Sequence, residues 1–275
     1  MVFSMEGGAC VYSFKVEVVP DRDFTITAWS GSFALRVLYD VLHRRGMDFG
    51  KREAKPFVVE PPVVGGTYLL SGFCLDMGGW PHPKLGWRLV EAGKPLVFRY
   101  HFLDEAVARE FLRGLLEDPV LVEPACRLEL AGVSFAQLGL PRPAGSGEEI
   151  IVRRVRFLTP TAFMFYGIDV LYPSPIRLML SALRNYGRLT GVDTRAAAEG
   201  VVKTVEAVYS PRFRRVYVDL GEGRVVPAFM GEVTLALRGS RDLPLLLAAL
   251  ESAEVLGVGI SRAVGFGRIK VEVGE

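Results

Sequence analysis

Near its C-terminal end the chain has a loop whose residue types suit the binding of an anion. Between a leucine-rich helical segment and a closing strand lie Gly257, Gly259, Ser261, Arg262, Gly265, Gly267 and Arg268. Glycine lets main-chain N–H groups approach a ligand closely, and guanidinium groups match phosphate oxygens. The order helix, loop, strand excludes a dinucleotide fingerprint. We therefore expect a phosphate cradle; the alternative is a connection that only turns the chain, with solvated arginines.

Two clusters of arginine lie on expected strands of the second half. They are Arg153, Arg154 and Arg156 in the first, and Arg212, Arg214 and Arg215 around Phe213 in the second. Interleaved arginine and aromatic side chains can pair with phosphates and stack on unpaired bases. On a solvated strand the same residues would form cross-strand ion pairs instead. We take Arg153, Arg156 and Arg214 as candidate contacts for a nucleic acid.

Charge is divided unevenly along the 275 residues. The overall net charge is +2, but residues 1–149 carry −3 and residues 150–275 carry +5. An anionic partner would favour the second half. Half of the residues are hydrophobic, which is enough for one large or two medium domains.

Three widely separated cysteines indicate neither a disulfide framework nor a zinc site, and a reducing cytoplasm is the expected location. No apolar run is long enough to cross a membrane, and the N-terminus has no signal-peptide pattern. The only side-chain amides are Asn185 and Gln137, and arginine far outnumbers lysine. This composition favours a thermophilic source, although a GC-rich genome would also raise the arginine content.

Each half shows the same order of expected elements. A strand (14–19 and 150–157) is followed by an amphipathic helix (32–45 and 176–189), then by strands (68–74 and 95–102; 214–218 and 225–237), a second helix (105–117 and 243–256) and a closing strand (126–130 and 268–273). The order βαββαβ is that of the ferredoxin-like motif. A Pro, Gly and Ser-rich stretch separates the halves. The prediction is an α+β chain with a ferredoxin-like domain at 1–140, a linker at 141–149 and a second such domain at 150–275.

Several motifs of the second half resemble one known family. They are the pattern GxGxxxxxGxG at 257–267, the segment FLTPTAF at 157–163 and the segment FMGEVT at 229–234. Together they resemble the CRISPR-associated repeat-processing endoribonucleases of the repeat-associated RNA-binding superfamily. The resemblance implies two ferredoxin-like domains that bind CRISPR repeat RNA and cut it at one phosphodiester.

The chemistry that the resemblance implies needs no metal and no cofactor. A ribose 2′-OH attacks the adjacent phosphorus and leaves a 2′,3′-cyclic phosphate, which requires a base, a cation and an acid. Among the three histidines, His43 is the candidate base, because it follows Tyr39 by four residues on one helix face. Lys51 and Arg52 follow that helix and are the candidate cations. The alternative is that His43 only complements the helix dipole, as a C-terminal residue beside Arg44 and Arg45.

Three functions remain open at this point. The leading one is a repeat-cutting endoribonuclease, and the second is an RNA-binding subunit of a CRISPR effector complex that does not cut. The third, a ferredoxin-like protein for a small ligand, is disfavoured by the positive second half. Association with effector subunits and formation of a homodimer are both open, and no membrane partner is expected.

Overall fold

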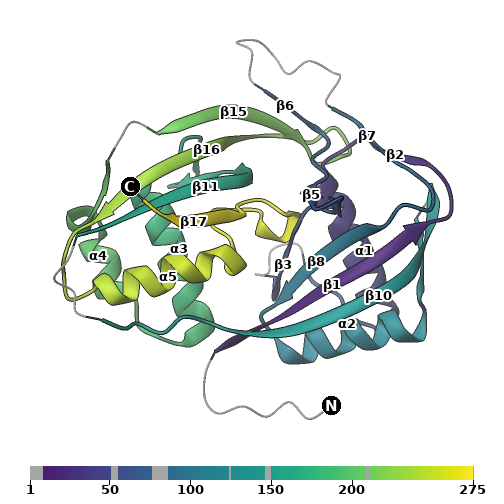
Figure 1. Cartoon of the computed structure of the whole chain (residues 1–275), viewed down its shortest axis with the longest axis horizontal. Coiled ribbons are helices and arrows are strands. Elements are labelled where there is room, and N and C mark those ends of the chain that lie inside the picture. The colour runs from purple at the N-terminus through teal and green to yellow at the C-terminus, as the bar shows by residue number, and fades with distance from the viewer. Residues whose placement is uncertain are drawn as a thin grey trace.

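The computed structural model describes residues 9–50, 55–75, 86–123, 125–145, 150–208 and 211–274, with only the backbone of 122 and 123. The chain forms two lobes, each built on an antiparallel sheet (Figure 1). The first sheet has seven strands in the order β5-β4-β8-β1-β10-β9, with β3 also paired to β8. Its strands are β1 (Cys10–Pro20), β3 (Phe57–Val59), β4 (Val63–Val64), β5 (Thr67–Tyr68), β8 (Leu96–Phe102), β9 (Val120–Glu123) and β10 (Cys126–Gly139).

Two helices cover one face of this sheet, namely α1 (Ser30–Arg44) and α2 (Glu105–Glu117). In α1 the residues Phe33, Val37, Leu38, Val41 and Leu42 are buried, so the apolar side of the helix faces the sheet. The helix α2 begins where the Asp104 carboxylate accepts hydrogen bonds from two backbone N–H groups of its first turn.

The second sheet has six strands in the order β17-β11-β16-β15-β6, with β14 paired to β16. Its strands are β6 (Phe73–Leu75), β11 (Ile151–Thr161), β14 (Val205–Ala207), β15 (Arg212–Asp219), β16 (Val225–Leu237) and β17 (Ile269–Val273). One face packs on α3 (Pro175–Thr190), α4 (Arg195–Thr204) and α5 (Leu243–Leu256). Two two-stranded sheets lie outside both larger sheets: β2 (Phe24–Ile26) pairs with β7 (Arg88–Val90), and β12 (Phe163–Phe165) forms a hairpin with β13 (Ile168–Val170).

Both sheets place the closing strand beside the first strand, and the first strand beside the third. The orders β10-β1-β8 and β17-β11-β16-β15 give this arrangement, with α1 and α2 between strands of the first sheet and α3, α4 and α5 between strands of the second. The predicted α+β fold with tandem ferredoxin-like domains is therefore confirmed.

The expected strand at 68–74 is in fact two strands that belong to different sheets. Thr67–Tyr68 pairs within the first sheet, whereas Phe73–Leu75 forms the edge of the second sheet beside β15. Between them Gly72 has a φ of +64°, and a Cβ there would lie 2.3 Å from the backbone of Trp29. The chain therefore crosses between the two sheets at a position that only glycine fits.

Three apolar clusters hold the fold together. One lies under each sheet, and a small third cluster of Trp29, Val216, Val218, Ala228 and Phe266 joins residues of the two halves. In it the rings of Trp29 and Phe266 meet edge to face, with centroids 5.6 Å apart. This cluster fixes the start of α1 against the C-terminal loop.

Other expectations differ in length or fall outside the described residues. The strand expected at 126–130 extends to Gly139, and α4 was not expected. Residues 141–145 form neither helix nor strand, and 146–149 lie outside the described part, so the domain division at 141–149 stays a prediction. In the described part, the structure contains no helix that is long and apolar enough to cross a membrane.

Candidate functional site

A cleft of about 720 Å³ lies between α1 and residues of the second half. Its α1 wall contains Ser32, Arg36 and Tyr39, which recur at the spacing that places residues on one helix face. The opposite wall is formed by the turn between β15 and β16, with Glu222 and Arg224, and by Val264 of the C-terminal loop. An arginine therefore lines the cleft from each half of the chain.

The candidate base His43 continues the same face of α1, one turn beyond Tyr39. The two rings stack in parallel, with centroids 5.6 Å apart and an interplanar angle of 3°. The His43 Nε2 atom lies 3.4 Å from the Asp48 Oδ1 atom, and both side chains are exposed. Burial raises the pKa of the Tyr39 hydroxyl, and the Asp48 carboxylate raises it further. Tyr39 is therefore a neutral hydrogen-bond donor next to a solvated imidazole.

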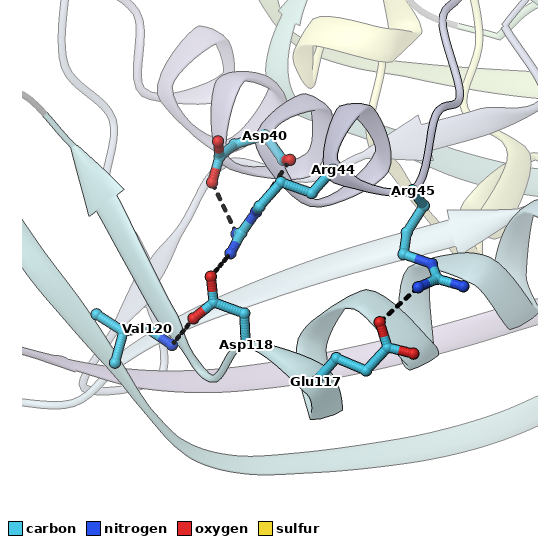
Figure 2. A network of polar contacts seen from close by, with 6 residues as sticks. All are labelled: Asp40, Arg44, Arg45, Glu117, Asp118 and Val120. Atoms are coloured by element: carbon cyan, nitrogen blue, oxygen red, sulfur yellow. Dashed lines mark hydrogen bonds and ion pairs between the residues drawn. The ribbon is translucent and has the colours of Figure 1, made fainter.

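The arginines that follow His43 bind the neighbouring helix. Arg44 contacts the Asp40 and Asp118 carboxylates, and Arg45 contacts Glu117 at the end of α2 (Figure 2). These contacts hold the C-terminal end of α1 against α2. The imidazole of His43 takes no part in them, since its ion-pair partner is Asp48.

The glycine-rich loop uses its main-chain N–H groups within the protein. The amides of Gly257, Gly259, Gly265 and Gly267 all donate to protein acceptors; for example, Gly259 N donates to Ser181 Oγ at 2.8 Å and Gly267 N to Pro160 O at 3.0 Å. Both glycines have positive φ, and a Cβ on Gly267 would lie 1.8 Å from Val258 O. The glycines therefore fold the loop tightly onto β11, and the four amides are not free to surround a phosphate.

The polar residues of the loop differ in their exposure. Ser261 is exposed, with a φ of +60°, next to the short 3-10 turn η1 (Arg262–Val264). The Arg262 guanidinium donates to Leu256 O at 2.7 Å. Burial lowers its pKa to about 10, and the positive charge of Arg188 contributes to this decrease. Arg262 stays protonated at neutral pH. Ser261 and Arg262 are the polar groups of the loop that a ligand in solution could reach.

Arg268 has a different environment from the one expected for a phosphate contact. Its side chain is buried, and its Nη2 atom lies 2.6 Å from the Glu60 Oε1 atom. Glu60 also binds His101 Nε2 at 2.7 Å and Tyr68 Oη at 2.8 Å, and Arg268 Nη1 donates to Val255 O at 2.7 Å. The structure thus places Arg268 in a buried polar cluster that links the loop to the first half.

The strand arginines divide between ion pairs and an open groove. Arg154 pairs with Glu232, Arg156 lies 3.6 Å from Glu272, and Arg153 donates to a backbone carbonyl. A groove of about 830 Å³ on this sheet is lined by Arg156, Arg212, Phe213 and Arg214, together with Phe73, Leu75, Phe157, Leu158, Pro211, Met230, Gly231 and Glu232. Charge and an exposed aromatic ring thus meet in one groove, which contains Arg156 and Arg214 but not Arg153.

Several functional candidates lie elsewhere or were missed. Lys51 and Arg52 are outside the described residues. Arg36 and Ser32 were not among the residues that the sequence pointed to, although extending the Tyr39 and His43 pair backwards along the helix would have found them. No sequence pattern pointed to Arg224, because its turn between β15 and β16 comes close to α1 only in the folded chain. No cluster of metal-ligating side chains occurs among the described residues.

Fold and cleft together define the class of the molecule: a tandem ferredoxin-like protein with a cleft between its two halves. Residues 155–269 match the family "CRISPR-associated endoribonuclease Cas6". Over these residues the chain is similar to the CRISPR repeat-processing endoribonuclease family, and the resemblance seen in the sequence motifs is confirmed.

Curated relatives and solved structures agree with this assignment. The Cas6 endoribonuclease of Mycobacterium tuberculosis is 34% identical over 141 residues, and that of Streptococcus thermophilus is 29% identical over 175 residues, 62% of this chain and 72% of that one. The Mycobacterium match covers 50% of this chain and only 43% of the relative's length. A Cas6 product complex has the same fold at a TM-score of 0.65 and 23% identity, over 95% of this chain and 100% of that one. The structure of Thermus thermophilus Cas6 matches with a TM-score of 0.64 and 20% identity, over 97% of this chain and 100% of that one.

Proposed function

We propose that this protein is an endoribonuclease that binds CRISPR repeat RNA and cuts it within the repeat to release guide RNAs. The observation that carries the proposal is the match of residues 155–269 to the Cas6 family. Proteins of the same fold have been solved as a product complex and as a substrate-mimic complex. The cleft, with Arg36 and Arg224 on opposite walls, is the proposed place for the scissile phosphate.

The proposed reaction is an internal transfer that needs no metal. The ribose 2′-oxygen bonds to the adjacent phosphorus, the bond from phosphorus to the 5′-oxygen breaks, and a 2′,3′-cyclic phosphate and a 5′-OH result. In our proposal neutral His43 takes the 2′ proton, and Tyr39 orients the ribose or protonates the leaving oxygen. Arg36, with Lys51 and Arg52 from outside the described residues, would stabilise the negative charge that develops on the phosphorane.

The remaining RNA-binding candidates extend this surface. Arg156 and Arg214 of the groove would pair with phosphates near Phe213, and Ser261 and Arg262 would bind the backbone at the loop. Gly257, Gly259, Gly265 and Gly267 contribute by shaping the loop, and Arg268 by anchoring it. Arg153 stays a weaker candidate, because its guanidinium donates to a backbone carbonyl.

A specific observation favours a second candidate, the RNA-binding subunit that does not cut. The loop meets α1 at Gly31, whose Cβ would touch Val264 O, whereas His43 is twelve residues further on. At 1.5 Å per residue, about 18 Å of helix separates the two points. If the scissile phosphate lay close to the loop, His43 would not reach it.

One experiment separates the two candidates. Purified protein is incubated with a repeat RNA in EDTA, and the product ends are identified by mass spectrometry. Cleavage at one position that leaves a 2′,3′-cyclic phosphate supports the endoribonuclease. Tight binding without cleavage, in EDTA and with added Mg²⁺, supports the subunit. Cleavage that depends on Mg²⁺ contradicts the proposed chemistry. A cytoplasmic location, association with effector subunits and a homodimer also remain proposals.

A further inference from the structure

The hairpin formed by β12 and β13 exposes an unusual run of apolar side chains. Met164, Phe165, Tyr166 and Ile168 are all exposed, and Tyr166 is 90% accessible at a φ of 47°. The rings of Phe165 and Tyr166 lie 4.5 Å apart between centroids. Single exposed apolar residues are ordinary, but a contiguous group marks an interaction site. None of these four side chains belongs to the clusters that hold the two sheets.

A stripe of arginines on α3 adjoins this hairpin. Arg177, Arg184 and Arg188 are spaced so that they share one face of the helix, over roughly 16 Å of its length. The helix has no acidic residue, and within the described ranges we find no ion pair for Arg184 or Arg188. The Arg177 guanidinium carbon lies 3.7 Å from the centre of the Phe165 ring, a cation–π contact. Hairpin and stripe are therefore one surface, which we call the α3 track.

The α3 track continues the surface of the glycine-rich loop. From the same side of α3, Ser181 Oγ accepts a hydrogen bond from Gly259 N, and Asn185 Nδ2 donates to Gly257 O at 2.9 Å. The loop residue Ile260 donates to Ala162 O at 3.0 Å, one residue before β12. A ligand that lies on the loop therefore reaches the track without crossing any other element.

We propose that the α3 track binds unpaired nucleotides of the RNA on the far side of the glycine-rich loop from the cleft. Phosphates pair with Arg184 and Arg188, and bases stack on Phe165 and Tyr166. The inference rests on the proposed function, and it adds a single-stranded segment to the substrate.

Chemistry favours a single strand over a protein as the occupant. Single-stranded RNA offers phosphates and the faces of unstacked bases together, which matches arginines that alternate with aromatic rings. An apolar protein partner would have to desolvate the same guanidinium groups without providing counter-charges. A paired helix hides its base faces, so the bound nucleotides must be unpaired.

The test compares two RNAs that a 2′-deoxy group at the cleavage position protects. One is the repeat alone, and the other has unpaired nucleotides added at both ends. The variants are the double substitution Phe165→Ala with Tyr166→Ala, and the double substitution Arg184→Ala with Arg188→Ala. Matched controls on α2 are Leu116→Ala, an exposed apolar residue, and Arg113→Ala, an exposed arginine. All of these side chains are at the surface, and thermal unfolding verifies that each variant folds.

The aromatic variant should lose roughly ten-fold in affinity for each stacked base with the extended RNA, and less than about two-fold with the repeat alone. The arginine variant should also bind the extended RNA with a weaker salt dependence. The slope of log affinity against log salt concentration should decrease in magnitude by about 0.7 for each phosphate that the variant no longer binds. Both controls should match the wild type.

Equal losses on both RNAs, or no loss on either, would overturn the proposal while leaving the proposed function intact. A wild-type dimer that the aromatic variant turns into a monomer, with RNA affinity unchanged, would assign the hairpin to a protein contact and also overturn it. If the wild-type protein binds neither RNA, the proposed function fails together with the inference.

Discussion

Arg268 and Glu60 form a buried ion pair that links the C-terminal loop to the first sheet. The two side chains are 7% and 4% exposed, and their charged atoms are 2.6 Å apart. Glu60 follows β3, and Arg268 immediately precedes β17, so the pair joins the two halves of the chain. His101 and Tyr68 complete the coordination of the carboxylate. The pair sets the position of the loop relative to the first half.

Removing one partner of this pair should be far more damaging than removing a surface charge. Arg268→Ala leaves the Glu60 carboxylate buried without its main counter-charge, which costs on the order of 3–5 kcal/mol. For a chain of this size, roughly 2–4 °C of melting temperature corresponds to each kcal/mol. Calorimetry should therefore find a fall of roughly 6–20 °C, compared with little change for the exposed control Arg113→Ala.

The double variant Glu60→Met with Arg268→Met provides the complementary measurement. It removes both charges at similar volume, so it should recover a large part of the stability that Arg268→Ala loses. If the double variant loses as much free energy of unfolding as the variants Glu60→Met and Arg268→Met lose in sum, the two residues act independently.

The same cluster predicts how stability depends on pH. Burial lowers the pKa of His101, although the Glu60 hydrogen bond opposes this, so the folded state favours the neutral imidazole more than the unfolded chain does. In the unfolded chain histidine titrates near 6.5, so below about pH 6.5 the unfolded state takes up a proton that the folded state does not. Stability should fall as the pH decreases from about 7 to about 5. Denaturant titrations at several pH values measure this slope.

The variant His101→Gln should flatten that slope, since it removes the titrating group and keeps a side chain that can donate to Glu60. Glu60 itself contributes at lower pH. Burial alone would raise its pKa, but Arg268, His101 and Tyr68 outweigh burial and hold the pKa well below the usual range. Its stabilising effect is present above the unfolded value of 4.5 and is lost as the pH falls towards the folded pKa. An unchanged slope in His101→Gln would show that other groups control the upper range.

Gly31 is the point at which α1 supports the loop. A Cβ there would lie 2.0 Å from Val264 O and 2.4 Å from Trp29 Nε1, and these two atoms form a hydrogen bond. Gly31→Ala should therefore displace the loop and destabilise the protein by about 1–3 kcal/mol. The matched control is Gly132→Ala in β10, where a Cβ meets nothing within 4 Å. Thermal unfolding of both variants tests this, and equal melting temperatures would contradict the close packing.

Local signals made much of the fold predictable. The expected bounds of α2, α5 and β16 coincide with those observed. The helix α2 and the strand β16 have a clear pattern of apolar residues, and α5 is an apolar run between a proline at its start and Gly257 at its end. The helix α4 has only ten residues, and the buried ones, Ala197, Val201 and Thr204, give too short a pattern to mark it in the sequence. The assignment of Phe73–Leu75 to the second sheet depends on pairing with β15, which is distant in the sequence and carries no local signal.

Prediction of the site had similar limits. The spacing of Tyr39 and His43 correctly placed both rings on one face of α1, and the same periodicity leads to Arg36. The glycine pattern correctly marked a specialised loop but not its internal hydrogen bonds. Arg268 looked like a phosphate contact because its counter-charge, Glu60, lies in the other half of the chain. Burial of a charged side chain by a distant segment is a property of the tertiary structure alone.

In the proposed reaction His43 is the general base that takes the 2′ proton. Removing a general base typically slows a reaction by about 10²–10⁴-fold, so His43→Ala should slow single-turnover cleavage by that factor. The imidazole is exposed, and its contacts are with Tyr39 of the same helix and Asp48 shortly after it, so RNA affinity should stay within a few-fold. His82→Ala, at the histidine outside the described residues, is the control and should cut at the wild-type rate. The parallel variant Arg36→Ala should reduce both the rate and the salt dependence of binding, because it removes a cation from the cleft wall. Cleavage by His43→Ala at the wild-type rate would exclude His43 as the base. Since the loop meets α1 at its opposite end, the base would then have to be sought nearer to Ser32 and Arg36.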